Sequence, residues 1–341
     1  MGAAHEIALP SVAARYFPPA SGKYEVKPNL MPLGTDFGNG PADKLTFQFD
    51  ASFAEYRKVK QAARAERLSK YYQTRDFAPE VAGTVCRFIA RRLAAEHPNL
   101  FVLDERGAEV TLRCALTGET LRFGPDMRRV AGAPGDPPYA DPFDALAAQV
   151  QEDLAVVRRV DGKDWAAAIH LCFPYRWTAE EKIGMDFVTM HLPVPGMETF
   201  RKPGMVTNMI KFGPFTRVVW ELSADDRLNH HREPPPGIDP EAWRERPFDP
   251  QHPRLFLRVE REVLHGFPEQ EAGLLAVRVS FRSGEEIRQD AALREPLCKT
   301  IESMSPEALR YKGLAESRDA ILDWLRSGAE LVVLVFDARP R

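Results

Sequence analysis

The sequence predicts an α+β fold built on a central antiparallel sheet. Residues 215–222, 254–262 and 274–282 alternate apolar with polar side chains, which is typical of antiparallel strands with one covered face. Segments nearer the two ends of the chain instead repeat apolar residues at helical spacing. Consecutive strands, with helices grouped before and after them, together predict the α+β class.

Length and charge limit the class of protein. The 341 residues suffice for one large domain or two ordinary ones. The 46 basic and 49 acidic residues give a net charge of -3, and no block of like charge marks a nucleic-acid or membrane surface. Because the sequence shows neither a secretory signal nor a run of about 18 uncharged apolar residues, we expect a soluble, cytoplasmic protein.

The N-terminal part of the chain is expected to surround the core. Prolines and glycines recur through residues 1–45, so this segment should be an extended arm. Residues 46–160 should form helices and a hairpin that pack on the core. Two helices are expected between residues 51 and 97, and a hairpin within residues 109–123.

A third helix is expected from Pro142 to residue 160. Asp141 is suited to cap it, and proline is favoured at the first helical position. The apolar residues Leu146, Val150 and Leu154 follow at helical spacing. This pattern predicts one continuous helix ahead of the core.

Residues 161–290 are expected to be the core, and residues 291–341 a C-terminal helical extension. A strand should span residues 166–173 and end at Pro174. Thr178 and Glu181 match a capping box for a helix that continues to about residue 192, where prolines stop it. Three strands follow, and Ser305 is suited to cap a helix of the extension.

Common phosphate-binding and nucleophile motifs do not occur. The sequence contains no GxGxxG, no P-loop, no GxSxG and no HExxH. No two of the four cysteines form a CxxC pair, so we expect buried, reduced thiols. Any redox chemistry therefore needs a cofactor that is held in another way.

His191 is the leading candidate for a metal ligand. It lies in the last turn of the helix expected before residue 192, where a neutral imidazole can ligate iron while its other N–H is donated to a carbonyl. The more common role is to satisfy the last carbonyls of the helix. His170 is the alternative, on a strand face with Ala168 and Cys172 where small side chains leave room, and Cys172 is a possible thiolate ligand.

Charged residues inside the strands permit two interpretations. Arg217 and Glu221 should share a face, as should Arg258 and Glu260, so these residues can form ion pairs on the solvent side of the sheet. Alternatively, an arginine faces a bound oxygen ligand or a carboxylate of a cofactor. Trp220 alternates to the face of Val218 and Leu222, which favours the core.

Several blocks of sequence resemble one family. The series CFPYRW, EKIG, MHLPVPG, TRVVWEL, LRVERE and YKGL is similar to the α subunit of the heme-dependent oxidative N-demethylases. The blocks run in the same order from residue 151 to the C-terminal helix, over about half of the chain. This resemblance implies a PAS-like fold, in which an antiparallel sheet and a helix hold heme b between them. It also implies that His191, on the helix before the last three strands, is the axial ligand of the iron.

The resemblance further implies a catalytic subunit of a monooxygenase. Such a subunit oxidises a small secondary or tertiary amine such as dimethylamine, consumes dioxygen and releases formaldehyde. The chain has no iron–sulfur cysteine set and no flavin motif, so FMN and a 2Fe–2S cluster are expected only on a partner reductase subunit. No nucleic-acid or membrane partner is expected.

Site roles follow from the same resemblance. The expected catalytic residues are Arg217, Arg258 and Glu260. Arg261 and Trp220 are expected beside the cofactor with His191, and His170 and Cys172 remain the alternative axial ligands. The chain departs from the family pattern in RVEREVLHGFP and in a long Pro-rich loop at residues 232–253. The competing hypotheses are a heme-based PAS gas or redox sensor and a non-catalytic assembly subunit.

Overall fold

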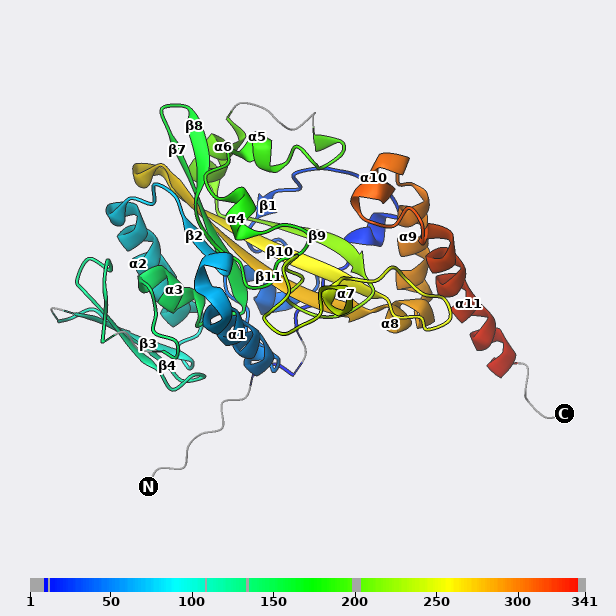
Figure 1. Ribbon diagram of the computed structural model, residues 1–341, viewed down its shortest axis with the longest axis horizontal. Helices are drawn as coiled ribbons and strands as arrows, with labels where there is room; N and C mark the ends of the chain where they lie inside the picture. The colour runs from blue at the N-terminus through cyan, green and yellow to red at the C-terminus, as the bar shows by residue number, and fades with distance from the viewer. Residues whose placement is uncertain (1–8, 12, 108, 133–134, 198–203, 337–341) are drawn as a thin grey trace, which may run out of the picture.

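A seven-stranded antiparallel sheet forms the centre of the protein. The computed structural model describes residues 9–11, 13–107, 109–132, 135–197 and 204–336. The strands of the large sheet, in spatial order, are β1 (Met31–Pro32), β9 (Phe215–Ser223), β10 (Phe256–Phe267), β11 (Ala272–Ser283), β7 (Glu152–Val160), β8 (Lys163–His170) and β2 (Tyr72–Thr74). This mixture of helices with antiparallel sheets is the one expected (Figure 1).

A smaller sheet and two groups of helices lie at the ends of the large sheet (Figure 1). The small sheet contains β3 (Phe101–Asp104), β4 (Val110–Cys114), β5 (Thr120–Phe123) and β6 (Val130–Ala131). On the same side are α1 (Phe53–Tyr71), α2 (Pro79–Glu96) and α3 (Pro142–Ala147). At the opposite end are α8 (Gly284–Gln289), α9 (Ala291–Glu302), α10 (Pro306–Tyr311) and α11 (Arg318–Phe336). Between the two groups lie the short helices α4 (Ala179–Lys182), α5 (Phe187–Met190), α6 (Met205–Phe212) and α7 (Pro240–Trp243).

The strand register assigns the charged side chains to two different faces. Arg258 lies opposite Glu221 and Glu262 opposite Arg217, whereas Arg261 lies opposite Val218. Side chains of directly opposed residues point to the same side of a sheet, and successive residues alternate. We call the side that carries Arg217, Val219, Glu221, Arg258, Glu260 and Glu262 the front face. The side that carries Val218, Trp220, Val259 and Arg261 is the back face.

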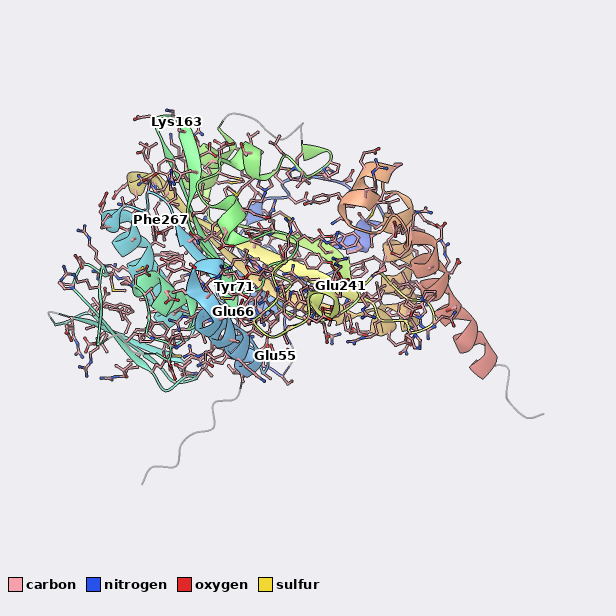
Figure 2. The ribbon with its side chains drawn as sticks, viewed as in Figure 1. Glu55, Glu66, Tyr71, Lys163, Glu241 and Phe267 are labelled. Atoms are coloured by element: carbon pink, nitrogen blue, oxygen red, sulfur yellow. The ribbon has the colours of Figure 1, made fainter. Side chains whose placement is uncertain are left out.

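The back face is covered by two hydrophobic clusters. Leu222, Leu257 and Val259 pack against α8, α9 and α11. Leu154, Val156, Leu274 and Ala276 pack against α2, α3 and the small sheet. Side chains fill the space between these layers (Figure 2). Most of the core of the protein therefore lies behind the sheet and around its ends, and a smaller cluster with Val279 and Tyr56 of α1 lies on the front face.

The front face is less fully covered. Ile169 and Leu171 of the β8 region pack with Ala179 of α4 and Met190 of α5, which places both short helices over this face. Several apolar side chains on this face stay half-buried, and we call four of them the apolar strip. They are Val219, Leu264, Leu275 and Val277.

Segment 142–160 is not the single helix that its spacing predicts. The helix ends at Ala147, and β7 begins at Glu152 between β11 and β8. Leu154 and Val156 are fully buried in the sheet, where β-branched residues fit well. An apolar run with both faces covered matches strand and helix spacing almost equally. The pairing of this segment with β11 and β8 therefore determines that it is a strand.

The helix expected before residue 192 is also broken. Gly184 has a φ of 78°, a conformation that suits glycine, and it separates α4 from α5. The break is stabilised by the strand beside it, because Gly184 N–H donates to Ala166 O at 3.0 Å and Ala166 N–H to Met185 O at 2.9 Å. His191 therefore ends a four-residue helix, and α6 follows before β9.

Several local predictions are confirmed. Asp141 caps α3, Thr178 and Glu181 form a capping box on α4, and Ser305 caps α10. All four cysteines, which lie in the described part of the chain, are buried and unpaired. Among the described residues, no helix combines the length and apolar character that a membrane span requires.

Candidate functional site

The backbone of α5 orients the imidazole of His191. Its Nδ1 lies 2.7 Å from the carbonyl oxygen of Phe187. Because a carbonyl only accepts a hydrogen bond, Nδ1 carries a hydrogen. In a neutral imidazole with this hydrogen, Nε2 is the nitrogen that can ligate a metal. The ring also packs on Phe187, with centroids 4.3 Å apart. The helix end thus fixes both the tautomer and the direction of the ring.

Side chains from β8 and α4 hold α5 in place. Phe187 N–H donates to Asp164 Oδ2 at 2.8 Å, and Lys182 Nζ donates to Met190 O at 2.8 Å. The first contact secures the start of α5 and the second its last residue. His191 is therefore positioned over the front face, even though α5 itself is short.

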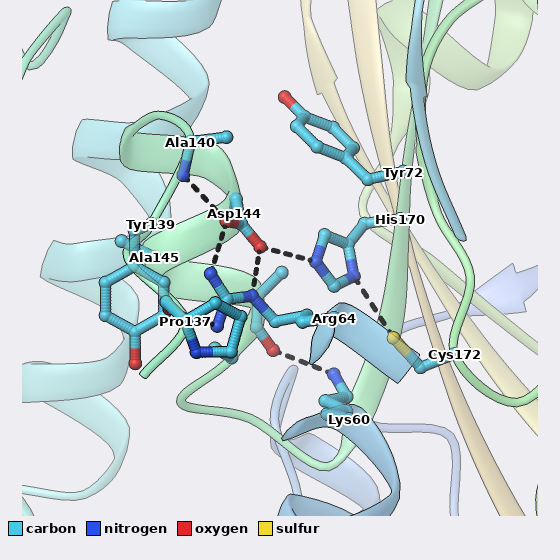
Figure 3. Close-up of polar contacts among 12 residues, drawn as sticks. Lys60, Arg64, Tyr72, Pro137, Tyr139, Ala140, Asp144, Ala145, His170 and Cys172 are labelled. Carbon is cyan, nitrogen blue, oxygen red and sulfur yellow. Dashed lines mark hydrogen bonds and ion pairs between the residues drawn. The ribbon is translucent and has the colours of Figure 1, made fainter. Parts of the chain in front are cut away.

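His170, the alternative ligand, is committed to a buried network (Figure 3). The residue is fully buried, and its Nε2 lies 3.0 Å from Asp144 Oδ1. Arg64 binds both oxygens of the same carboxylate at 2.9 Å. Burial alone would raise the pKa of Asp144, but hydrogen bonds from His170 and Arg64 outweigh it and hold that pKa well below its usual range. His170 has the structural role that is common for a buried histidine.

Cys172 is not placed to act as a thiolate. Its Sγ lies 3.8 Å from Nδ1 of His170, and the side chain is fully buried. Burial raises the pKa of this thiol far above its usual value, and the nearby carboxylate of Asp153 raises it further. Cys172, His170 and Asp144 are the residue types of a nucleophilic triad. Because the buried thiol stays neutral, it is not a nucleophile, and the group has a structural role.

On the front face, Arg217 pairs with Glu262 rather than with Glu221. The guanidinium binds the carboxylate through two contacts of 2.8 and 2.9 Å across β9 and β10. Both side chains remain partly accessible. This bidentate pair places a fixed charge beside the apolar strip.

Glu260 and Arg258 form the next pair along β10. Arg258 is fully buried; its Nη1 donates to Glu260 Oε1, and its Nη2 donates to Phe173 O at 2.8 Å. The guanidinium lies over the ring of Tyr175 at 4.9 Å. The Glu260 side chain keeps 23% of its surface exposed. Glu260 therefore reaches the accessible front face, and Arg258 lies behind it.

Arg261 and Trp220 lie on the back face, away from His191. Arg261 is buried and donates to Leu45 O at 2.7 Å and to Asp43 O at 3.2 Å. Trp220 packs on the cluster formed with α8, α9 and α11. The sheet separates these two side chains from the front face, and their expected contact with a cofactor stays a prediction.

A polar group at the far end of the front face has no local sequence signal. Lys312 Nζ lies 3.0 Å from Glu221 Oε1 and 2.8 Å from Trp220 O. Burial raises the pKa of the neighbouring Tyr311 to about 12, and the charges of Glu221 and Glu260 add to the shift. The YKGL block that contains Lys312 is evident only as part of a sequence resemblance, because its contacts come from a distant strand.

These residues suit a flat apolar group that carries anionic substituents. The apolar strip offers a half-buried surface, His191 offers a neutral imidazole above the sheet, and Arg217 offers a guanidinium beside it. A macrocycle that brings most of its own metal ligands needs only one such histidine. Among the described residues, the front face therefore carries the side chains that suit heme.

A comparison with models of protein families matches this chain over residues 42–322. The family is described as haem-dependent oxidative N-demethylase, alpha subunit-like. The matched range begins within the 3₁₀ helix at Gly40–Lys44 and ends within α11. It therefore includes six of the seven strands of the large sheet, all except β1, together with His191 and every front-face residue described above.

Proposed function

Because the chain belongs to the haem-dependent oxidative N-demethylase, alpha subunit-like family, we propose that it is the heme-containing catalytic subunit of an oxidative N-demethylase. Membership supports the general kind of protein, an oxidoreductase that depends on heme. An α subunit implies further subunits in the same enzyme. The proposed substrate is a small secondary or tertiary amine such as dimethylamine, from which the enzyme releases formaldehyde.

We place the heme on the front face, with His191 as the axial ligand of the iron. The observation that carries this assignment is the 2.7 Å contact between His191 Nδ1 and Phe187 O, which orients the ring and makes Nε2 the nitrogen that would ligate the iron. The apolar strip supports the assignment by offering a partly covered surface for the macrocycle. Arg217 is the proposed partner of a propionate, because its planar guanidinium suits carboxylates.

Bound heme would supply dioxygen activation, with two electrons from a partner reductase that carries FMN and a 2Fe–2S cluster. The protein's own residues would bind and orient the amine. Glu260 is the proposed acceptor for an N–H of the alkylammonium ion, since its carboxylate reaches the front face. Hydroxylation of the N-methyl group would give a carbinolamine, which releases formaldehyde and the demethylated amine.

The visible spectrum of the purified, hemin-supplied protein tests this proposal. We expect a Soret band in the wild type and loss of stable heme binding in His191→Ala. His252→Ala is the matched control, because His252 is exposed and its side chain pairs with the nearby Asp249. An unchanged ferric spectrum in His191→Ala would move the axial ligand to another residue.

Addition of dimethylamine then separates the enzyme from the sensor. We expect the amine to change the spectrum of the heme-loaded protein, because the substrate would bind beside the iron. A heme-loaded protein that ignores dimethylamine and trimethylamine would favour a heme-based sensor. Absence of any Soret band would contradict both hypotheses.

A further inference from the structure

We propose that Asp153 is a positioning residue for the front-face carboxylate Glu260, acting through the backbone of Phe173 and the guanidinium of Arg258. The function of Glu260 in this chain of contacts rests on the proposed function. The contacts themselves do not, so they can be tested without heme. Asp153 lies on β7, two strands away from Arg258 and Glu260 on β10.

The first link joins Glu260 to Arg258. One nitrogen of the guanidinium donates to Glu260 and another to Phe173 O, while Tyr175 supports its flat side. A planar guanidinium with contacts in two directions cannot rotate without breaking one of them. Arg258 Nε has no hydrogen-bond partner among the described residues, so these two contacts are its hydrogen bonds. The orientation of Glu260 therefore depends on where the Phe173 carbonyl lies.

The second link fixes that carbonyl. Phe173 precedes Pro174, so its carbonyl belongs to a peptide without an N–H, and β8 has already ended at His170. Backbone hydrogen bonds hold the flanking residues, from Leu171 N–H to Tyr71 O at 2.8 Å and from His230 N–H to Pro174 O at 3.0 Å, but not Cys172 and Phe173 between them. Instead, Cys172 N–H donates to Asp153 Oδ1 at 2.8 Å and Phe173 N–H donates to Asp153 Oδ2 at 2.9 Å. One buried carboxylate thus replaces the missing ladder.

The two oxygens of Asp153 explain why a carboxylate is needed. Each accepts from a different backbone N–H, and a carboxyl group offers two acceptor oxygens at this spacing. In Asp153→Asn, an amide nitrogen would face one of the two donors. The size of the side chain stays the same, so the substitution disturbs the Phe173 carbonyl without opening a cavity. Lys60, whose Nζ lies 5.3 Å from the Phe173 ring, remains beside the segment.

Arginine side-chain NMR of the heme-free protein tests the contacts. In protein labelled with ¹⁵N-arginine, the Nε–H signal of Arg258 is assigned by its loss in Arg258→Met. We expect Asp153→Asn to shift or broaden this signal. The matched control is Asp50→Asn, a buried carboxylate on Arg278, which should shift the Arg278 signal and leave that of Arg258 unchanged.

An unchanged Arg258 signal in a folded Asp153→Asn protein would overturn the proposal. If that variant does not fold, Asp153→Glu takes its place, because it keeps both acceptor oxygens and moves them by one methylene. We expect a smaller shift of the same signal. A folded Asp153→Glu protein with the wild-type Arg258 signal would overturn the proposal equally.

A double-mutant cycle tests the link to function. In heme-loaded protein, we expect Asp153→Asn to raise the dissociation constant for dimethylamine roughly tenfold, a coupling typical of residues in one network. In the Arg258→Met background the same substitution should have no further effect. Independent, additive effects would mean that Asp153 does not act through Arg258 and would overturn the proposed link to Glu260. If the heme-loaded wild type ignores the amine, the proposed function fails, while the NMR result still decides the positioning.

Discussion

Glu152 should make the protein less stable as the pH rises from acid to neutral. This residue lies on β7 opposite Arg278, on the back face, and is buried. Its Oε1 accepts from Gln48 N–H at 2.8 Å, whereas its Oε2 has no hydrogen-bond partner among the described residues. Burial raises its pKa from the usual 4.5 to about 7, although Arg278 and Lys60 oppose the shift.

The size and sign of the effect follow from this pKa. Below pH 4.5 the carboxyl group is neutral in both the folded and the unfolded chain. Between pH 4.5 and 7 the unfolded chain ionises and the folded protein does not, so the free energy of unfolding falls. Above pH 7 both states are ionised, and the loss stays constant at about 3 kcal/mol.

Urea denaturation of the wild type and Glu152→Gln between pH 4.5 and 8 measures this effect. Glutamine can still accept from Gln48 N–H but does not titrate. We expect the free energy of unfolding of Glu152→Gln to rise by about 3 kcal/mol relative to that of the wild type as the pH increases across this range. Glu241→Gln, at an exposed position, should show a constant difference. A difference between wild type and Glu152→Gln that does not change with pH would refute the reasoning.

Other substitutions test other parts of the structure. Asp144→Asn leaves the buried Arg64 without its carboxylate and should lower the free energy of unfolding by about 3–5 kcal/mol in urea. Lys312→Met should lower the free energy of unfolding by about 2–4 kcal/mol because it leaves Glu221 unpaired. Adding Glu221→Gln should recover part of this loss, and additive losses would contradict the pairing. Gly184→Ala should cost about 1–2 kcal/mol, since φ at this position is 78° and the added methyl group meets Arg75. It should also weaken heme binding by moving α5, and an unchanged heme spectrum at equal occupancy would contradict that coupling.

Local sequence signals predicted several strands and helix starts correctly. The alternation in residues 215–222 and 274–282 identified β9 and β11, and Asp141, Thr178 and Ser305 cap helices as expected. Each of these signals depends on neighbours within a few residues. Where the outcome depended on the rest of the fold, as in β7, the same reasoning predicted the wrong element.

In the candidate site too, local signals predicted some features, and others depend on contacts between distant parts of the chain. Alternation within β9 correctly placed Trp220 with Val218 and Leu222, away from Arg217. It could not pair Arg217 with Glu262, because that pairing depends on the register between two strands far apart in the sequence. Nor could it find Lys312, which comes from a helix end near the C-terminus. His191 and His170 were separable only after the contacts of each ring were known.

The division of β10 between two faces makes the candidate site sensitive to the parity of residue numbers. Successive side chains of a strand point to opposite faces. In β10 the even-numbered Glu260 and Glu262 therefore point to the front, and Arg261 between them points to the back. Inserting or deleting one residue ahead of Glu260 within the strand would exchange these sets, burying carboxylates in the core and moving Arg261 to the front. A change of two residues would shift the charges along the strand but keep their sides. Related chains that conserve this chemistry should therefore differ in length in the loop before β10, at residues 232–253, rather than inside the strand.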